Sequence, residues 1–287
     1  MAGAARSARP GCRAFSAEDS VALLSRPLPR ASVPSSGQGL FALMALQLAA
    51  PQARGVLGDP ADLSYVRAVG GELRIGSLTR HADLSGSALA CQHLAILADV
   101  GGVLAGRGMR RSQTVGGILC QADPAEDLAA VLAAVQATMM IRGRGGTRAV
   151  PARHFHLGPY KTVVEPGELL TEIRIPIRPC GSAYETETRP GGCPVTGAAA
   201  VICLDGDTVT RAGLALTPAP ARHRGTAEAE ELLAGSVTTR LSLGKAGEIA
   251  AGQCACPAGA RRPGTGQCAA GRLITRALHR ALLRAQA

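Results

Sequence analysis

The chain has 287 residues, 46% of them hydrophobic, and a formal net charge of +10. It is long enough for two domains with separate cores, and its apolar content excludes a disordered polypeptide. The charge does not predict nucleic-acid binding, because the basic residues are almost all arginines scattered among Ala and Gly rather than gathered into a groove.

The first hundred residues contain three helix signals and one strand signal. Ser16 to Asp19 is typical of a capping box that opens a short helix through Leu24. Leu40 to Ala49 and Leu94 to Leu104 have helical compositions, whereas Leu73 to Leu78 alternates as a half-buried strand does. No apolar run reaches the length that a membrane span needs.

Asp123 to Ala137 gives the clearest helical pattern. Asp123 is a good N-cap residue, Pro124 suits the first helical position, and Glu126 completes the capping box. The apolar residues after it recur at helical spacing and are expected to be buried; they are Leu128, Val131, Leu132 and Val135.

Strands dominate the segment that follows. Met139 to Arg142 and Thr147 to Val150 are expected to pair across a turn over Gly143 to Gly146, and Leu169 to Ile175 predicts a further strand that Pro176 stops. The next stretch, Pro179 to Pro194, is rich in Gly, Pro and Thr. We therefore expect a domain boundary near its start, dividing the chain into residues 15–178 and 179–287.

The last hundred residues predict a hairpin and two helices. Ala198 to Leu204 and Thr208 to Leu216 flank Asp205-Gly206-Asp207, a strong turn signal. Thr226 to Leu233 and Ala270 to Ala285 are typical of helices, and the tract between them is expected to be a loop.

The nine cysteines form an odd set without regular spacing, which predicts reduced thiols instead of a disulfide framework. Cys254, Cys256 and Cys268 lack a C-x-x-C pair and a nearby histidine, so no metal site is expected.

Two distant glycine-bearing segments are the most informative motifs. They are Ser35-Ser36-Gly37-Gln38-Gly39 and Thr114-Val115-Gly116-Gly117, and the second continues into Asp123 to Asp127. Loops of this kind next to helices bring backbone N–H groups and the positive end of a helix dipole to an anion, so two of them can hold one diphosphate. No G-x-G-x-x-G after a strand and no G-x-x-x-x-G-K-[ST] occurs. The motifs predict a dinucleotide-cofactor binder of another type.

These motifs resemble those of the medium, FAD-binding subunit of the molybdenum hydroxylases, typified by carbon monoxide dehydrogenase and xanthine dehydrogenase. The first family loop, A-G-G-(Q/H)-S-L, corresponds to Ser35 through Leu40, and the second, R-N-x-G-T-(I/V)-G-G-(N/S), to Arg110 through Ile118. The family's A-D-P-x-x-D matches Ala122 to Asp127 in full, and further blocks match at Ile75 to His81 and Glu165 to Pro176.

The resemblance implies an α+β fold. A two-part FAD-binding domain, like that of the PCMH or vanillyl-alcohol oxidase type, precedes a smaller domain with an antiparallel sheet and helices. It also implies a cytoplasmic hetero-oligomer with a [2Fe-2S] small subunit and a molybdopterin large subunit. Electrons would pass from the clusters to this flavin and then to an external acceptor, so no catalytic acid, base or metal ligand is expected here.

The resemblance also implies which residues contact FAD. Asp127 would bond a ribityl or flavin-side hydroxyl, and Leu170 would pack on the isoalloxazine ring. The two loops would face the diphosphate through Ser35, Ser36, Gly37, Gln38 and Gly39, and through Thr114, Gly116, Gly117 and Ile118. Plain structural roles remain open: turn glycines in the first loop, a first-turn carboxylate at Asp127, and a core residue at Leu170.

Four departures from the family pattern fall in these loops. Ser36 and Gln113 replace glycines, Gly39 replaces a serine, and Ile118 replaces Asn or Ser. At roughly 0.5–1.5 kcal/mol for each lost hydrogen bond, they predict a degenerate FAD site, weakened by about 2–6 kcal/mol. A flavin-free scaffold that docks partner chains is the alternative function, and a stand-alone FAD oxidoreductase is a third.

Overall fold

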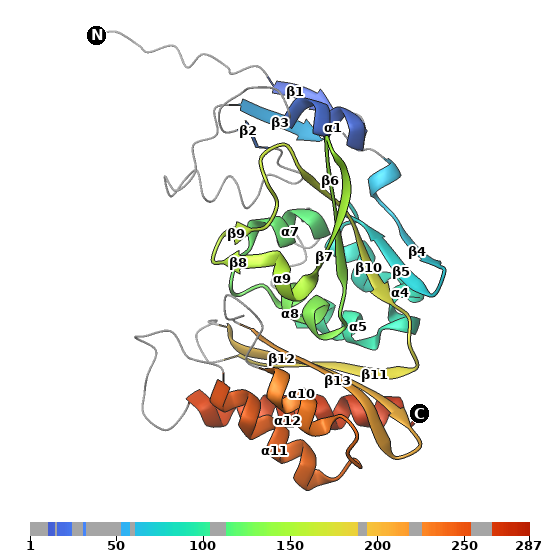
Figure 1. Ribbon diagram of the computed structural model, residues 1–287, viewed down its shortest axis with the longest axis vertical. Coiled ribbons are helices and arrows are strands. Elements are labelled where there is room, and N and C mark those ends of the chain that lie inside the picture. The colour runs from blue at the N-terminus through green and yellow to red at the C-terminus, as the bar shows by residue number, and fades with distance from the viewer. Residues whose placement is uncertain are drawn as a thin grey trace, which may run out of the picture.

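The computed structural model describes residues 11–14, 16–24, 31–32, 53–57, 61–103, 113–188, 194–217, 226–253 and 266–287. The described residues form three larger sheets and one two-stranded sheet, β8-β9. The three larger sheets follow one another along the long axis, with the N-terminal elements at one end and the C-terminal helices at the other (Figure 1). The first glycine segment, Ser35 to Gly39, and the helix expected over Leu40 to Ala49 lie outside the described residues.

A small parallel sheet begins the chain, with strands in the order β1-β3-β2. Helix α1 (Ala17–Leu24) follows the first strand, and the Ser16 Oγ accepts a hydrogen bond of 3.0 Å from the Asp19 N–H. The helix start predicted from the capping box is therefore confirmed. The strands are β1 (Gly11–Ala14), β2 (Ala31–Ser32) and β3 (Ala53–Leu57).

The second sheet is antiparallel, in the order β4-β5-β10-β6-β7. At its centre Ile173 lies opposite both Ile75 and Met139, and all three side chains are buried. The hairpin and the strands expected from the sequence are confirmed. The strands are β4 (Val66–Val69), β5 (Glu72–Gly76), β6 (Thr138–Gly143), β7 (Gly146–Pro151) and β10 (Leu169–Pro176).

Short helices pack beside this sheet, and α8 (Asp127–Ala134) is buried along its whole length. The sequence predicts Asp123 as the N-cap, which is wrong, because the N-cap lies three residues later. Asp123 instead closes a turn, because its carboxylate accepts from the Ala125 N–H at 3.0 Å, and Glu126 is the N-cap. The other elements are a 3₁₀ turn (Ala61–Leu63), α3 (His81–Gly86), α4 (Ala88–His93), α5 (Ala95–Val103), α7 (Val115–Gln121), α9 (Ala152–Phe155), β8 (His156–Gly158) and β9 (Lys161–Thr162).

The third sheet is antiparallel, in the order β11-β12-β13, and helices cover its outer face. The hairpin of β12 and β13 is confirmed, with Gly206 at a φ of +56° in its turn. The elements are β11 (Cys180–Thr188), β12 (Pro194–Asp205), β13 (Thr208–Thr217), α10 (Ala227–Leu233), α11 (Arg240–Gln253) and α12 (Gly266–Ala285).

The sequence predicts a loop before the last helix, and this prediction is wrong where the structure forms α11. Three glycines weaken the helical pattern there, but one of them has a packing function. A Cβ at Gly247 would overlap Thr275 and the Gly271 carbonyl, so the missing side chain lets α11 approach α12 closely.

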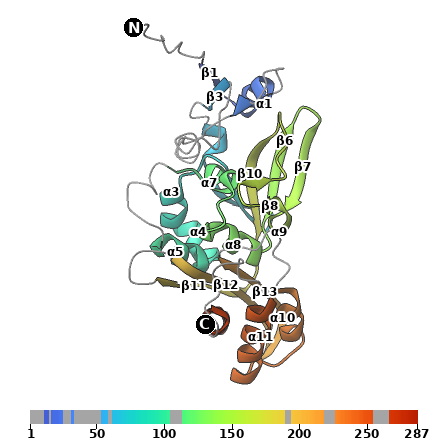
Figure 2. The same ribbon diagram turned by 90° about the vertical axis from the view of Figure 1, so that its left-hand side faces the viewer.

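Figure 2 shows the third sheet between α5 and α8 on one face and α11 and α12 on the other. Along β12, Ala199, Val201 and Cys203 belong to the core shared with α8, whereas Ala198, Ala200 and Ile202 belong to the core shared with α12. This alternation is what a strand buried on both faces requires. The α+β fold with antiparallel sheets that the resemblance implies is confirmed.

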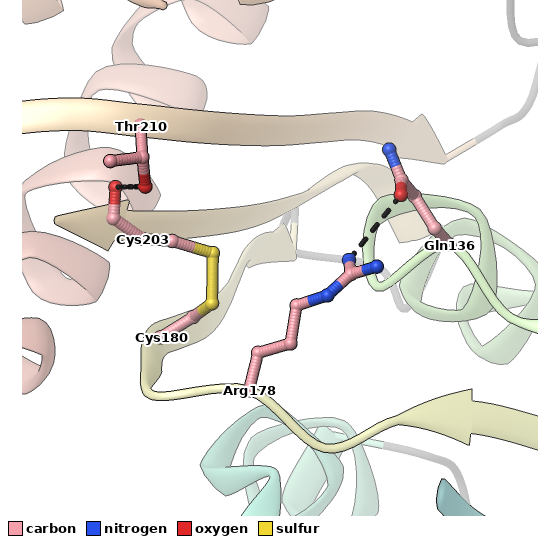
Figure 3. Close-up of a disulfide and its surroundings, with 5 residues drawn as sticks. All are labelled: Gln136, Arg178, Cys180, Cys203 and Thr210. Carbon is pink, nitrogen blue, oxygen red and sulfur yellow. Dashed lines mark hydrogen bonds between the residues drawn. A yellow bond between two sulfur atoms is a disulfide. The ribbon is translucent and has the colours of Figure 1, made fainter. Parts of the chain in front are cut away.

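Cys180 and Cys203 form a disulfide across β11 and β12, so the expectation of reduced thiols is wrong for this pair (Figure 3). The two residues are directly opposite in the strand register, with Cα atoms 4.2 Å apart. A spacing of 23 residues carries no local signal, and only the register of the sheet brings them together.

None of the helices that the structure describes is both long and apolar enough to span a membrane.

Candidate cofactor site

The second glycine segment is held against the chain that follows β5. The Val115 N–H donates to the Thr79 carbonyl at 2.9 Å, and the Gly116 N–H donates to the Ser77 carbonyl at 2.7 Å. A Cβ at Gly116 would lie 2.8 Å from the Ser77 Cβ, so this position needs glycine for close packing. Both N–H groups therefore anchor the segment and are not available to a diphosphate.

Thr114 begins α7 as its N-cap residue. Its Oγ1 accepts a hydrogen bond of 3.2 Å from the Gly117 N–H, and its side chain is buried. Gly117 is half-buried, whereas Ile118 is only 4% exposed. An apolar residue at position 118 therefore suits its place in the interior, and its side chain is not part of an open binding surface.

Asp127 is the first residue of α8, and its carboxylate is buried in a hydroxyl cluster. The Tyr184 hydroxyl donates a hydrogen bond to Asp127 Oδ1 and lies 3.3 Å from Thr217 Oγ1. Tyr184 comes from β11 and Thr217 from β13, so the cluster joins the third sheet to α8. A Cβ at Gly197 would collide with the Tyr184 hydroxyl, and glycine there leaves room for the ring.

The sequence reasoning missed Tyr184 as a site residue. Its partner Asp127 lies 57 positions earlier in the chain, and no spacing rule connects a strand tyrosine to a helix start so far away. One signal was present: Asp127 is a carboxylate within a run of apolar residues and had to find a buried donor.

Burial controls the ionisation of this cluster. Loss of hydration raises the pKa of Asp127, and the hydrogen bonds from Tyr184 and Thr217 lower it in part. Burial also raises the pKa of Glu126 to about 7, and the nearby charges of Asp127 and Asp123 add to this. The pKa of the Tyr184 phenol is raised by burial and by the Asp127 charge, so the phenol stays protonated and remains a donor.

Leu170 lies on β10 opposite Ile141 and is 2% exposed. It belongs to the same core as Val115 of α7 and Leu128 of α8. The structure thus brings the second glycine segment, Asp127 and Leu170 onto elements that share one core.

An ion cluster fixes the third sheet beside this core. Asp99 of α5 pairs with Arg280 and Arg284 of α12, both at 2.7 Å, and accepts a hydrogen bond of 3.1 Å from the Tyr184 N–H. Glu185, next to Tyr184, pairs with Arg280 at 3.1 Å. The main-chain position of Tyr184 is therefore set by a buried carboxylate that belongs to the other part of the chain.

Comparisons with known proteins agree on one family. The family described as "FAD binding domain in molybdopterin dehydrogenase" matches residues 8–178. The carbon monoxide dehydrogenase medium chain of Afipia carboxidovorans is 34% identical over 278 residues, which cover 96% of each chain.

Two solved structures are similar over nearly the whole chain. A carbon monoxide dehydrogenase from Hydrogenophaga pseudoflava gives a TM-score of 0.87 at 31% identity, covering 96% of this chain and 97% of the other. Quinoline 2-oxidoreductase from Pseudomonas putida 86 gives 0.87 at 25% identity, covering 98% and 99%.

Proposed function

This chain belongs to the family of FAD-binding domains of molybdopterin dehydrogenases, and we propose that it is the flavin subunit of a molybdopterin-dependent hydroxylase or dehydrogenase complex. In that role it accepts electrons from iron–sulfur clusters and delivers them to an external acceptor. The observation that carries the proposal is the 34% identity to a medium chain along 96% of both sequences.

The described residues fit FAD at two places. The anchored second loop has a half-buried glycine at Gly117 beside the Thr114 hydroxyl, so no large side chain obstructs a close approach. Asp127 offers a buried carboxylate that hydroxyl donors hold in a defined position, which suits a ribityl hydroxyl. Bound FAD supplies the electron-accepting and electron-donating chemistry.

Each site residue then has a specific role. Gly117 approaches the diphosphate beside Thr114, which caps α7; Asp127 accepts from a flavin-side or ribityl hydroxyl; and Leu170, which is 2% exposed, supports the ring from within the core. Gly116 and Ile118 support this site from within, by packing and by burial. The first loop, Ser35 to Gly39, lies outside the described residues, and its contact with the diphosphate stays a prediction.

We propose domains at residues 15–178 and 179–287, supported by the end of the family match at residue 178. We also propose a cytoplasmic hetero-oligomer with a [2Fe-2S] small subunit and a molybdopterin large subunit. Its support is the similarity to proteins described as medium chains and medium subunits. The alternative of a flavin-free scaffold is not favoured by these relatives, which include a protein described as an FAD-binding subunit.

Titration of the purified chain with FAD tests the proposal. A ligand that binds the native state raises the unfolding free energy, by about 2.7 kcal/mol at a hundredfold excess over Kd. We expect the thermal midpoint to rise with FAD, and to rise less in the matched Asp127→Asn variant. FMN, which lacks the diphosphate-linked adenosine, serves as the ligand control. A midpoint unaffected by FAD would contradict the proposal and favour the flavin-free scaffold.

A further inference from the structure

The disulfide lies where the chain crosses from the second sheet to the third. Cys180 is the first residue of β11, directly after Arg178 and Pro179, which are both exposed (Figure 3). Cys180 itself is half-buried, whereas Cys203 is only 8% exposed. Cys180 is therefore the more exposed of the two residues, so we expect an attacking thiolate to bond to its sulfur and Cys203 to be the leaving group.

One arginine is opposite Cys203 in the strand register, and another precedes Cys180 by two residues. Arg211 of β13 is directly opposite Cys203 in the strand register, so the two side chains share one face of the sheet. Its Nε and Nη2 are buried and have no hydrogen-bond partner within the part of the chain that the structure describes. Arg178 precedes Cys180 by two residues, and its guanidinium extends toward the amide oxygen of Gln136, at 3.5 Å (Figure 3). A positive charge next to a sulfur stabilises the departing thiolate and speeds its release.

The same face of β11 forms the junction between the two parts of the molecule. Ser182 Oγ accepts a hydrogen bond of 3.3 Å from the Ile96 N–H, and the Tyr184 hydroxyl donates to Asp127. Because side chains alternate along a strand, Cys180, Ser182 and Tyr184 all point toward α5 and α8. The disulfide thus fixes the first residue of this row covalently to the central strand β12.

We propose that the Cys180–Cys203 disulfide is a thiol–disulfide exchange site, opened by dithiol reductants, that controls how firmly β11 is held at the junction with α5 and α8. When the covalent link is lost, only hydrogen bonds and packing hold the start of β11. The strand then opens locally more often, since local opening depends on the number of constraints that remain.

The exchange balances as a two-electron step. A thiolate of the dithiol bonds to the Cys180 sulfur, and the bond between Cys180 and Cys203 breaks with its electron pair on Cys203, which then takes up a proton. The second thiol of the reductant, as its thiolate, attacks the reductant sulfur of this mixed disulfide. Cys180 leaves with the electron pair and is protonated. The protein gains two thiols, and the dithiol becomes a cyclic disulfide.

A consequence for FAD rests on the proposed function. Asp127 depends on Tyr184, which is four residues from Cys180 on the same strand face, so opening the disulfide loosens a donor to the FAD site. We expect the reduced chain to bind FAD about three- to tenfold more weakly than the oxidised chain. If neither form binds FAD, the proposed function fails, and the exchange measurements below still decide the role of the disulfide.

The test compares the full chain purified without reductant with the same chain treated anaerobically with dithiothreitol. Alkylation and peptide mass spectrometry should label Cys180 and Cys203 only after reduction. Amide hydrogen exchange across residues 180–184 should then become about tenfold faster, as local opening becomes easier. Three results would overturn the proposal: labelling of both cysteines before reduction, resistance of the disulfide to dithiothreitol, or unchanged exchange after reduction is verified.

Matched variants separate this disulfide from the other thiols. The double variant Cys180→Ser and Cys203→Ser should exchange as the reduced chain does and should not respond to dithiothreitol. Cys120→Ser removes a cysteine that is free in the structure, and this variant should keep the full response. If the double variant fails to fold, the oxidised and reduced forms of the natural chain still give the decisive comparison.

Discussion

The two faces of the β11–β13 sheet are built on different principles. Toward α11 and α12 the sheet presents mainly small and aliphatic residues, with Glu185 as a charged residue that pairs with α12. The buried apolar residues on this face include Ala183, Ala198, Ala200, Ile202, Leu214 and Leu216. Toward α5 and α8 it presents hydroxyls and a disulfide, each with a defined partner: Ser182, Tyr184, Thr217 and the Cys180–Cys203 pair. One face fills volume, whereas the other fixes positions.

The two faces of the sheet therefore contribute differently to stability and to the proposed FAD site. Burial of apolar area is non-directional and scales with the area removed from water, so the apolar residues of the helix face supply stability without setting the place of any polar atom. Hydrogen bonds depend on distance and angle, so the junction face sets where Asp127 and Tyr184 lie. Changes on the first face should alter folding alone, and changes on the second should alter FAD affinity as well.

Leu278→Ala should give the largest loss of stability. Leu278 is fully buried on α12 in the core under the helix face, and a cavity there costs about 2–5 kcal/mol of unfolding free energy. Urea denaturation measures it, with Leu283→Ala as the control, because Leu283 is 68% exposed. FAD affinity of the folded fraction should not change. A tenfold weaker affinity would show that the two faces are not separable.

Asp99→Ala tests the ion cluster that joins the two parts. The Asp99 carboxylate is 7% exposed and accepts from two arginines and from the Tyr184 N–H. Its removal leaves buried donors without a partner, at a cost of about 2–4 kcal/mol once the partial solvation of Arg280 is allowed for.

The matched control for this cluster is Arg276→Ala. Arg276 pairs with Glu185 from a side chain that is 64% exposed, and such a pair contributes about 0–1 kcal/mol. Denaturation midpoints compare the two variants. Equal losses in both would contradict a buried anchor at Asp99.

Tyr184→Phe should combine a smaller loss of stability with a loss of affinity. The ring is kept, but Asp127 loses a donor, which costs about 1–2 kcal/mol. FAD titration should show an affinity about tenfold lower, because 1.4 kcal/mol is a factor of ten in Kd. Tyr160→Phe, at a tyrosine that is 52% exposed, should change neither quantity. Unchanged FAD affinity in Tyr184→Phe would show that the hydroxyl cluster is not part of the FAD site.

Glu126→Gln should give the smallest effect, and only as a function of pH. The pKa of Glu126 is raised to about 7 from its usual value of 4.5, so the folded chain holds a proton that the unfolded chain releases. Stability is therefore lost as the pH rises from 4.5 to about 7, by on the order of 1 kcal/mol.

The variant should show a smaller decline, because a glutamine does not ionise, whereas Asp127, whose pKa is also raised, still does. Denaturation measured between pH 4.5 and pH 8 checks the difference, and Asp62→Asn, at an exposed carboxylate, should retain the natural profile. A decline of the same size in Glu126→Gln would assign the pH dependence to another group.

Sequence patterns predicted the local structure well where the signal was local. The hairpins at Gly143 to Gly146 and around Gly206 follow from turn residues between alternating strands, and α1 follows from Ser16. The start of α8 was predicted too early, because Asp123 bonds to its own turn at Ala125. α11 was missed because three glycines weaken its helical pattern, although one of them, Gly247, serves packing against α12.

The candidate site was only partly predictable, because some of its residues belong to local motifs and others meet only through long-range contacts. The glycine segment and Asp127 belong to compact motifs, so a pattern can find them. Tyr184, Cys180 and Cys203 acquire their partners through strand register and through packing between distant elements. A one-dimensional pattern holds no information on register when both faces of a sheet are buried.

Amide hydrogen exchange of the full chain with and without saturating FAD tests the central claim most directly. The claim is that the α7 loop, the start of α8 and β11 of the third sheet together form one flavin site. It predicts slower exchange on FAD binding at residues 114–118, 127–130 and 182–186, with no change in α11. FAD binding that protects none of the first three segments, or that protects α11 equally, would contradict it.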